Sequence, residues 1–241
     1  MGESTMTAKL SIVLPCYNTP NLLDNLAEVL SVAKTITKDF EIILVDDGSK
    51  EFPDIIQTDK VKVITNEKNM GKGYSLRRGF GLARGNIISF IDADLEIPAT
   101  LLKPYYQIMQ GNRNPDILVG SKRHFNSSIS YPMFRRLLSF IFQTMNRLMF
   151  GLVVLDTQSG IKFFKRDIIK QLLPYLYTNG FAVDLEILSL AQRKGYKIIE
   201  GPINIKKSFS STISIWAIFR MIRDSFNIWF RYKFKKEVSK K

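Results

Sequence analysis

Two aspartates, Asp92 and Asp94, follow directly after an apolar run, Ile87–Ile91, and only Ala93 separates them. Carboxylates at this spacing can both face one cation, and Mg²⁺ and Mn²⁺ prefer oxygen ligands. Mg²⁺ typically binds one or two carboxylates together with substrate phosphates. The pair therefore predicts a divalent-metal site for a phosphorylated substrate. The simpler alternative is that both aspartates only end a strand and cap the next helix.

Two more polar turns follow apolar runs in the first half of the chain. Asp46-Asp47-Gly48-Ser49 follows Glu41–Val45, and Gly71-Lys72-Gly73 comes after Val61–Thr65. Lys72 stands just before an expected helix, where its charge and the helix N-terminus can both meet a phosphate. The glycines do not have the spacing of a Walker phosphate loop or of a full dinucleotide fingerprint. The alternative is that they only close a strand-to-helix turn.

The elements that would position these residues alternate between strand and helix, which predicts an α/β fold with a mostly parallel sheet and helices on both faces. In such sheets ligands bind at the carboxyl ends of the strands, where the acidic turns stand. We expect Asn18 or Thr19 to cap the first helix. The expected strands are 10–14, 41–45, 61–65, 87–91 and 116–119, and the expected helices are 22–33, 74–84 and 98–110.

Three helices are expected in the second half. The segment Tyr131–Val154 is apolar around most of its circumference, and Ala182–Lys194 carries Asp184 and Glu186 early and ends before Gly195. The segment Ile213–Phe234 interleaves aromatic and basic residues, which is typical of a helix lying in a membrane interface. The alternative for this last helix is packing on the sheet with a solvated basic face. We expect no membrane-spanning helix, because polar or charged residues interrupt each apolar window.

Composition limits the classes of protein and site. The chain of 241 residues suits one large domain or one domain with a C-terminal appendage, and we expect a catalytic domain at 1–208 and an amphipathic, basic segment at 209–241. The formal net charge of +13 suggests anionic partners. No nucleic-acid-binding motif is present, so we expect no nucleic-acid partner. A single cysteine excludes an internal disulfide, a single histidine excludes a His-rich metal site, and 1–9 lacks the apolar core of a signal peptide.

The motifs, taken in order, resemble family 2 glycosyltransferases of the GT-A fold. They are Ile12–Asn18, Val45–Ser49, Asn69–Gly73 and Asp92–Asp94. Gly120–Arg123, Asp156–Lys162 and Phe181–Glu186 are similar to the polyprenyl-phosphate branch, which includes dolichyl-phosphate β-glucosyltransferases and dolichyl-phosphate mannose synthases. The last two motifs favour the glucosyl type. The Gln-x-x-Arg-Trp motif of processive synthases is absent, which argues against polysaccharide synthesis.

The resemblance implies roles for single residues. On the donor side, Lys72 would lie near the donor, Gln158 and Asp184 would bound the sugar, and Asp92 with Asp94 would hold a Mg²⁺ or Mn²⁺ ion and the diphosphate. The residues lining the nucleotide pocket would be Pro15, Tyr17, Asn18, Asp46 and Ser49.

On the acceptor side, Arg123 would lie between the donor diphosphate and the acceptor phosphate. The expected catalytic residues are Asp94, which would hold the metal ion, and Arg123. The acceptor phosphate would also contact Arg135 and Ser139, which share a helix face, and Lys206.

The expected reaction is a single inverting displacement that moves a hexose, with glucose favoured, from a nucleotide-diphosphate sugar to a polyprenyl or dolichyl phosphate. A lipid monophosphate is largely dianionic at neutral pH and needs cations rather than a general base. The donor alternatives are GDP-mannose and UDP-GlcNAc in place of UDP-glucose. With a soluble acceptor, Asp184 or Glu186 would have to serve as the base.

The expected location is the cytoplasmic face of a membrane, with the enzyme bound peripherally. This would be the endoplasmic reticulum in a eukaryote or the inner membrane in a bacterium. A membrane-protein partner is a further possibility.

Overall fold

The computed structural model describes residues 9–127, 133–203 and 215–234, and within helices α4 and α7 it describes the side chains of 142–150 and 219–233. The described strands form one seven-stranded sheet in the order β3-β2-β1-β4-β6-β5-β7. Their bounds are β1 (Leu10–Cys16), β2 (Phe40–Asp46), β3 (Val61–Thr65), β4 (Ile87–Ile91), β5 (Ile117–Ser121), β6 (Ile161–Lys165) and β7 (Ile198–Pro202).

The predicted mostly parallel sheet is confirmed, with one strand of opposite direction among those described. β6 runs antiparallel to β4 and β5, and the other pairs are parallel. The helices are α1 (Leu22–Ile36), α2 (Lys72–Leu82), α3 (Leu102–Gln110), α4 (Met133–Phe150), α5 (Arg166–Leu172), α6 (Val183–Arg193) and α7 (Ile215–Phe234), with short 3-10 turns at Ala99–Leu101 and Leu173–Tyr175.

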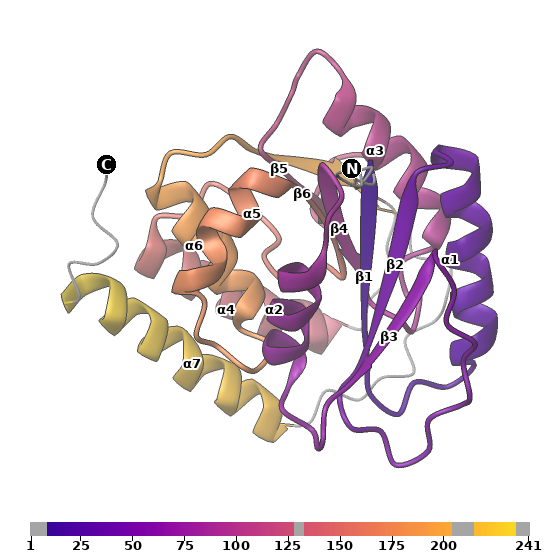
Figure 1. The fold of residues 1–241 in the computed structure, drawn as a ribbon. Helices are drawn as coiled ribbons and strands as arrows, with labels where there is room; N and C mark the ends of the chain where they lie inside the picture. The colour runs from indigo at the N-terminus through magenta and orange to yellow at the C-terminus, as the bar shows by residue number, and fades with distance from the viewer. Residues whose placement is uncertain (1–8, 128–132, 204–214, 235–241) are drawn as a thin grey trace.

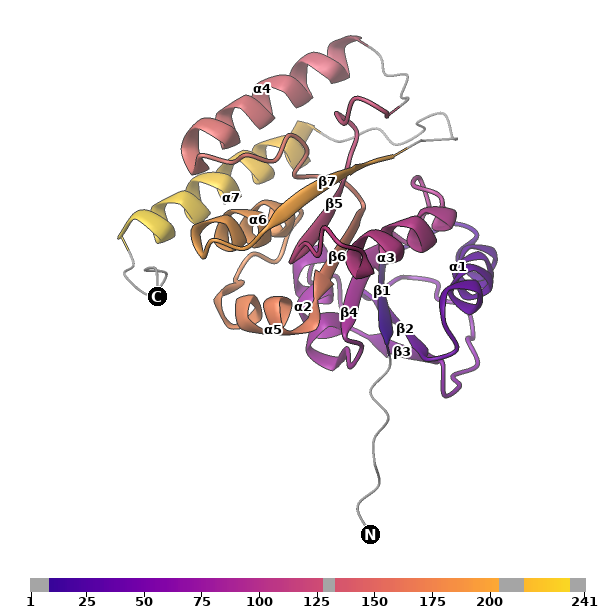
Figure 2. The ribbon, with the colours of Figure 1, turned by 90° about the horizontal axis from the view of Figure 1, so that it is seen from above.

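Helices cover both faces of the sheet, as the alternation predicts (Figure 1). Ile12 of β1 points to the face that α1 and α3 cover, whereas Val13 points to the face that α2 covers. Because successive side chains of a strand point to opposite faces, β1 takes part in both cores. α4 and α7 contact each other and lie side by side at the end of the molecule opposite α1 (Figure 2).

A buried carboxylate holds the amino ends of the central strands together. Glu41 of β2 accepts hydrogen bonds from the Ser11 hydroxyl and the Arg84 backbone N–H, each at 2.7 Å, and also pairs with the Arg84 guanidinium and with Lys62. Burial alone would raise the pKa of Glu41. The two hydrogen bonds and the neighbouring cations outweigh burial and hold the pKa below its ordinary value.

The helix near the C-terminus packs on the rest of the described chain. Ser225, Ile228 and Tyr232 of α7 are buried, and α7 contacts α4 and α6. Among the described helices, none combines the length and the apolar character that a membrane span requires. The division between 1–208 and 209–241 remains a prediction, because 204–214 lie outside the described residues.

The predicted cap of α1 is wrong. Asn21, with φ of 55°, precedes the helix, and its side chain makes no capping hydrogen bond. The Asn18 side chain instead accepts a hydrogen bond from the Lys50 N–H, so Asn18 holds a neighbouring loop rather than the helix.

Candidate active site

The ends of the central parallel strands place the predicted donor residues at one edge of the sheet. Cys16 of β1 pairs in register with Asp46 of β2, and β4 lies on the other side of β1. Pro15 is half-buried near the end of β1, whereas Tyr17 is 43% exposed just beyond it. The carboxyl ends of β1, β2 and β4 therefore meet, as the strand pattern predicts.

Three of the predicted nucleotide-pocket residues are joined by hydrogen bonds. The Asn18 N–H donates to Ser49 Oγ at 2.8 Å, and the Ser49 N–H donates to Asp46 Oδ1 at 3.1 Å. Asp46 is buried, while Asn18 is exposed. This arrangement fixes the two loops after β1 and β2 against each other.

Asp47 positions the turn before Lys72, a role that the sequence did not reveal. Its Oδ1 accepts hydrogen bonds from the Met70 N–H at 3.0 Å and from Asn66 Nδ2 at 2.7 Å. Its Oδ2 accepts one from the Gly71 N–H at 2.7 Å. Gly71 has a φ of 97°, which favours glycine, and a Cβ there would collide with the Asn179 carbonyl. The available signal was the second aspartate of the Asp46-Asp47 turn.

Lys72 joins two of the predicted donor residues. Its Nζ lies 2.7 Å from Asp92 Oδ1 and 3.5 Å from Asp184 Oδ2. The side chain of Lys72 is only 11% exposed, and Nζ also stands 5.0 Å from the centre of the Phe90 ring. The structure thus brings Lys72, Asp92 and Asp184 together although they are far apart in the sequence.

Lys162 completes this group, although its motif alone indicates no role for it. It extends from β6 and is fully buried, and its Nζ donates to Asp184 Oδ1 and to the Ser159 carbonyl, each at 2.8 Å. Asp92, Lys72, Asp184 and Lys162 therefore form a chain of alternating charges, which we call the charge chain. The signal for Lys162 was a lysine inside an apolar strand, because a buried charge requires a partner.

The pKa values in the charge chain follow from burial and from these contacts. Burial would lower the pKa of Lys72, but Asp184 and Asp92 raise it above its ordinary value, so Lys72 stays protonated. Burial raises the pKa of Asp92, and Lys72 opposes this effect. For Lys162, burial lowers the pKa below its ordinary value, and the nearby Asp184 carboxylate opposes this effect only in part.

Asp94 differs from Asp92 in exposure and in its contacts. Asp94 is exposed, and its Oδ1 accepts a hydrogen bond from the Glu96 N–H at 3.1 Å. Asp92 Oδ1 is held by Lys72, and Gly160 stands so close to the Asp92 carboxylate that a Cβ would lie 2.5 Å from Oδ2. Asp94 is therefore the more accessible carboxylate of the predicted metal pair.

The residues beside Asp92 fit a metal that binds together with its substrate. Within the described residues no three His, Cys, Asp or Glu side chains cluster as a complete metal site. Mg²⁺ does not need one, because it keeps phosphate oxygens and water as ligands. Next to Gly160, the buried atoms Thr157 Oγ1, Gln158 Nε2 and Ser159 Oγ have no hydrogen-bond partner among the described residues. Unpaired buried polar atoms in the segment that leads into Gly160 are suited to a polar ligand.

The residues predicted to contact the acceptor are only partly described. Arg123 is exposed just after β5, and its N–H donates to Ser121 Oγ. Arg135 and Ser139 belong to α4, one helical turn apart, but their side chains are outside the description. Lys206 also lies outside the described residues. The acceptor contacts of these residues stay predictions.

Glu186, two residues after Asp184 on α6, faces the opposite way because residues i and i+2 of a helix do not share a face. Its Oε2 accepts hydrogen bonds from the N–H groups of Tyr177 and Thr178, and its Oε1 lies 2.7 Å from the Arg231 guanidinium. Helix α6 thus contributes Asp184 to the charge chain, and its Glu186 contacts helix α7.

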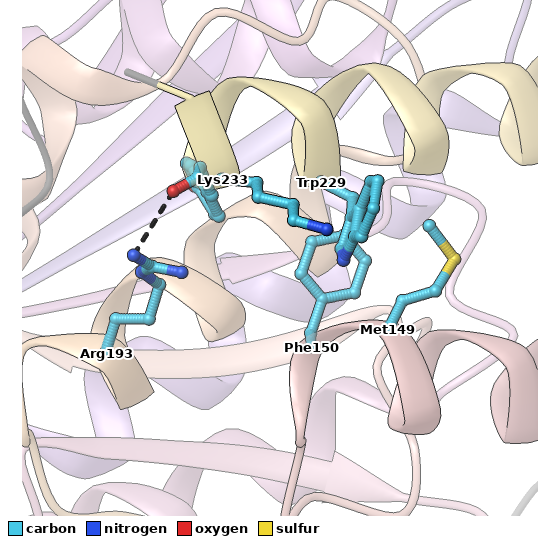
Figure 3. Close-up of a pocket in the computed structure, with 6 residues that line it drawn as sticks. Met149, Phe150, Arg193, Trp229 and Lys233 are labelled. Carbon is cyan, nitrogen blue, oxygen red and sulfur yellow. Dashed lines mark hydrogen bonds between the residues drawn. The ribbon is translucent and has the colours of Figure 1, made fainter. Parts of the chain in front are cut away.

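Two cavities border helix α7. One of about 330 Å³ lies between the ends of α4 and α7, where Trp229 and Phe150 face each other and Arg193 donates to the Tyr232 carbonyl at 3.3 Å (Figure 3). None of its lining residues is a predicted site residue. The second cavity, of about 520 Å³, borders the Asn69–Gly71 turn that precedes Lys72.

Comparison with known proteins gives a consistent result at the level of sequence. The model of the family described as glycosyl transferase family 2 matches residues 11–173. A dolichyl-phosphate beta-glucosyltransferase of Drosophila melanogaster is 30% identical, over 95% of this chain and 77% of that protein. The human protein of the same name is 31% identical, over 94% of this chain and 76% of its own length.

Solved structures support the fold. Glucosyl-3-phosphoglycerate synthase from Mycobacterium tuberculosis in complex with UDP aligns with a TM-score of 0.68 at 17% identity, over 92% of this chain and 80% of that one. The complex of the same enzyme with Mn²⁺, UDP-glucose and phosphoglyceric acid gives a TM-score of 0.67 at 16% identity, with the same coverage. The predicted GT-A architecture is confirmed by these likenesses.

Proposed function

The chain belongs to glycosyl transferase family 2, and from this premise we propose that it transfers glucose from UDP-glucose to a polyprenyl phosphate of the dolichyl type. Both relatives reported above are named for glucosyl transfer to dolichyl phosphate, which favours glucose over mannose as the transferred sugar. The UDP and UDP-glucose complexes of the structural neighbours favour a uridine nucleotide in the donor pocket.

The donor binds at the carboxyl edge of β1, β2 and β4. Asn18, Asp46 and Ser49 form the hydrogen-bonded loop pair that would hold the nucleotide. Lys72 stays cationic beside Asp92, where it attracts the diphosphate. Gln158 precedes by two residues Gly160, which stands against the Asp92 carboxylate, and its unpaired Nε2 can donate to a sugar hydroxyl.

A divalent ion fits beside Asp94 with Asp92 as its neighbour, and Mg²⁺ and Mn²⁺ complexes are known among the structural neighbours. When bound, such an ion would neutralise the negative charge that develops on the departing diphosphate. Asp94 is the accessible carboxylate for this contact. Asp92 is already neutralised by Lys72, so its main contribution is to hold Lys72 in place.

The observation that carries the proposal is that both candidate bases are already occupied. Asp184 is 1% exposed, and its two oxygens contact Lys162 and Lys72. Glu186 is fully buried and bonded to backbone N–H groups and to Arg231. Neither carboxylate is placed to take a proton from an acceptor hydroxyl, whereas a lipid phosphate needs no base. The phosphate oxygen therefore attacks the anomeric carbon with inversion, and the bond from that carbon to the diphosphate breaks as UDP leaves.

The two helices opposite α1 are suited to face a bilayer. On α7 the exposed aromatic residues Phe219, Phe226 and Phe230 recur at helical spacing, and on α4 Leu148 is 81% exposed. Basic and aromatic residues on one helix are typical of segments that lie in the membrane interface. We infer that the enzyme binds the cytoplasmic face of a membrane through α4 and α7, where the acceptor's lipid tail is anchored.

The test is transfer from radiolabelled UDP-glucose and GDP-mannose, in parallel, to dolichyl phosphate in detergent, with Mn²⁺, with Mg²⁺ and with EDTA. We expect label in the lipid phase from UDP-glucose alone, abolished by EDTA and in the Asp94→Asn variant. The product should carry the β configuration. Label from GDP-mannose instead would overturn the donor assignment, and transfer to a soluble hydroxyl acceptor would overturn the proposed acceptor.

A further inference from the structure

A basic groove lies between α7 and two loops near the charge chain. The cavity has a volume of about 520 Å³. One wall is formed by the turn before Lys72 and by the loop before α6, and the other wall is α7. Its lining residues are Asn69, Met70, Gly71, Tyr177, Thr178, Asn179, Gly180, Arg220, Arg223, Asp224, Asn227 and Arg231.

Helix α7 presents two adjacent stripes of different chemistry here. The groove stripe is Arg220, Asp224, Asn227 and Arg231, at the three- and four-residue spacing of one helix face. The aromatic stripe is Phe219, Phe226 and Phe230, which are 61%, 50% and 59% exposed. Each aromatic residue immediately precedes a member of the groove stripe, so the two stripes run side by side along α7.

The charge of the groove is positive. Three arginines line it against one lining carboxylate, Asp224, which pairs with Arg223 at 3.2 Å. Arg231 is held from behind by Glu186, and its guanidinium stands 5.0 Å from the centre of the Tyr177 ring. These contacts fix Arg231 in place. Arg220 and Arg223 are exposed at the mouth of the groove.

We propose that this groove binds the phosphate headgroup of an anionic phospholipid, at a position separate from the acceptor. Arginine recognises phosphate through a planar fork of donors, and several arginines around one cavity are suited to that group. The neighbouring aromatic stripe is suited to the apolar side of the same lipid. The proposal rests on the membrane-facing orientation of α7 in the proposed function.

An occupant of the groove would contact the donor side of the enzyme. Asn69–Gly71 leads directly into Lys72, and the Gly73 N–H donates to the Asn179 carbonyl at 2.7 Å. Arg77 of α2 in turn donates to the Thr178 carbonyl at 2.6 Å. The loop before α6 is therefore joined to the start of α2, and a bound headgroup would stabilise both walls of the groove.

The experiment is sedimentation of the full-length protein with phosphatidylcholine vesicles that contain no additive, phosphatidylserine, or dolichyl phosphate. The variants are Arg220→Gln/Arg223→Gln and the charge-preserving Arg220→Lys/Arg223→Lys. The matched control is Lys34→Gln/Lys38→Gln, which removes the same charge from exposed positions in α1 and just after it, and α1 lies at the opposite end of the molecule (Figure 1). Thermal unfolding of each variant verifies that it is folded.

We expect the glutamine variant to bind phosphatidylserine vesicles roughly thirtyfold more weakly than the parent protein, because it loses the contacts of two arginine forks with phosphate, and the control variant to bind as the parent does. The lysine variant should also lose most of this binding, because lysine lacks the fork. Full binding by the lysine variant would overturn the proposal in favour of diffuse attraction. If the glutamine variant lost binding only to vesicles with dolichyl phosphate, the groove would be the site of the acceptor, and this result would also overturn the proposal. Glucosyl transfer in detergent tests the proposed function separately, because no bilayer is present.

Discussion

Replacing Lys162 by methionine tests whether the charge chain holds the donor site together. Methionine keeps much of the length of the side chain and removes only its charge and donors. In the native protein Lys162 is fully buried, and its Nζ lies 2.8 Å from Asp184 Oδ1. In the variant Asp184 stays buried with Lys72 as its remaining cation, at 3.5 Å.

The size of the effect follows from these contacts. Breaking a buried ion pair by removing one partner costs about 3–5 kcal/mol, because the other charge is left behind. Lys72 compensates part of this cost, so we expect the free energy of unfolding to fall by about 3 kcal/mol. For a chain of this size that loss lowers the melting temperature by roughly 6–12 °C. In the variant, Asp184 should also draw Lys72 away from Asp92. Because Lys72 is the proposed contact of the donor diphosphate, the Michaelis constant for UDP-glucose should rise about tenfold.

Urea unfolding at neutral pH measures the stability, and the detergent transfer assay measures the Michaelis constant. The double variant Lys162→Met/Asp184→Asn serves as the control, because it leaves no unpaired carboxylate at Asp184. It should be more stable than the single variant by at least about 1 kcal/mol. A single variant that loses less than about 1 kcal/mol, or a double variant that is less stable than the single one, would refute the reasoning.

Three further predictions concern residues around the same sheet. Gly160→Ala should raise the Michaelis constant for UDP-glucose about tenfold, because a Cβ at this position would lie 2.5 Å from Asp92 Oδ2. The control Gly81→Ala should leave the constant unchanged, because a Cβ there meets no atom within 4 Å. Equal constants for the two variants in the transfer assay would contradict this prediction. Burial raises the pKa of the Cys16 thiol to about 12, so iodoacetamide should label it slowly at pH 8 in the folded protein and rapidly in urea. Stability should also fall as the pH rises above 9, because the unfolded thiol loses its proton first, and this fall should be less steep in Cys16→Ala. The pKa of Glu41 lies below its ordinary value, so the stability that Glu41 contributes is present above pH 4.5 and is lost as the pH falls through the lowered pKa. In urea unfolding from pH 7 to pH 3, the stability of Glu41→Gln should therefore fall less steeply with decreasing pH than that of the parent protein. An equal fall in both proteins would exclude this role of Glu41.

Much of the parallel half of the sheet can be predicted from the sequence. The run Ile87–Ile91 and the segment Val61–Thr65 are strands with the expected bounds, because apolar runs between turn signals specify buried strands. The position of β6 could not be predicted. Whether Ile161–Lys165 inserts between β4 and β5, and in which direction, depends on contacts between segments far apart in the chain. The short helix Arg166–Leu172 directly follows β6 and has no separating turn signal.

The sequence names single candidate site residues but does not reveal how they are arranged. Asp92, Lys72 and Asp184 were each named from their motifs, yet nothing in their spacing indicates that Lys72 bridges the two carboxylates. Lys162 and Asp47 act by holding other residues, and such roles depend on the folded geometry. The acceptor residues Arg135 and Lys206 remain predictions, because their side chains are not described.

The placement of Glu186 has a practical consequence for shortening this protein. A truncated form that stopped before α7 would remove Arg231 from a fully buried carboxylate and would uncover the surface that Ile228 and Tyr232 now occupy. The uncompensated carboxylate would lie two residues from Asp184, on the helix that supports Lys72. Recombinant forms intended for crystallisation or inhibitor screening should therefore keep α7 even where a membrane is not needed.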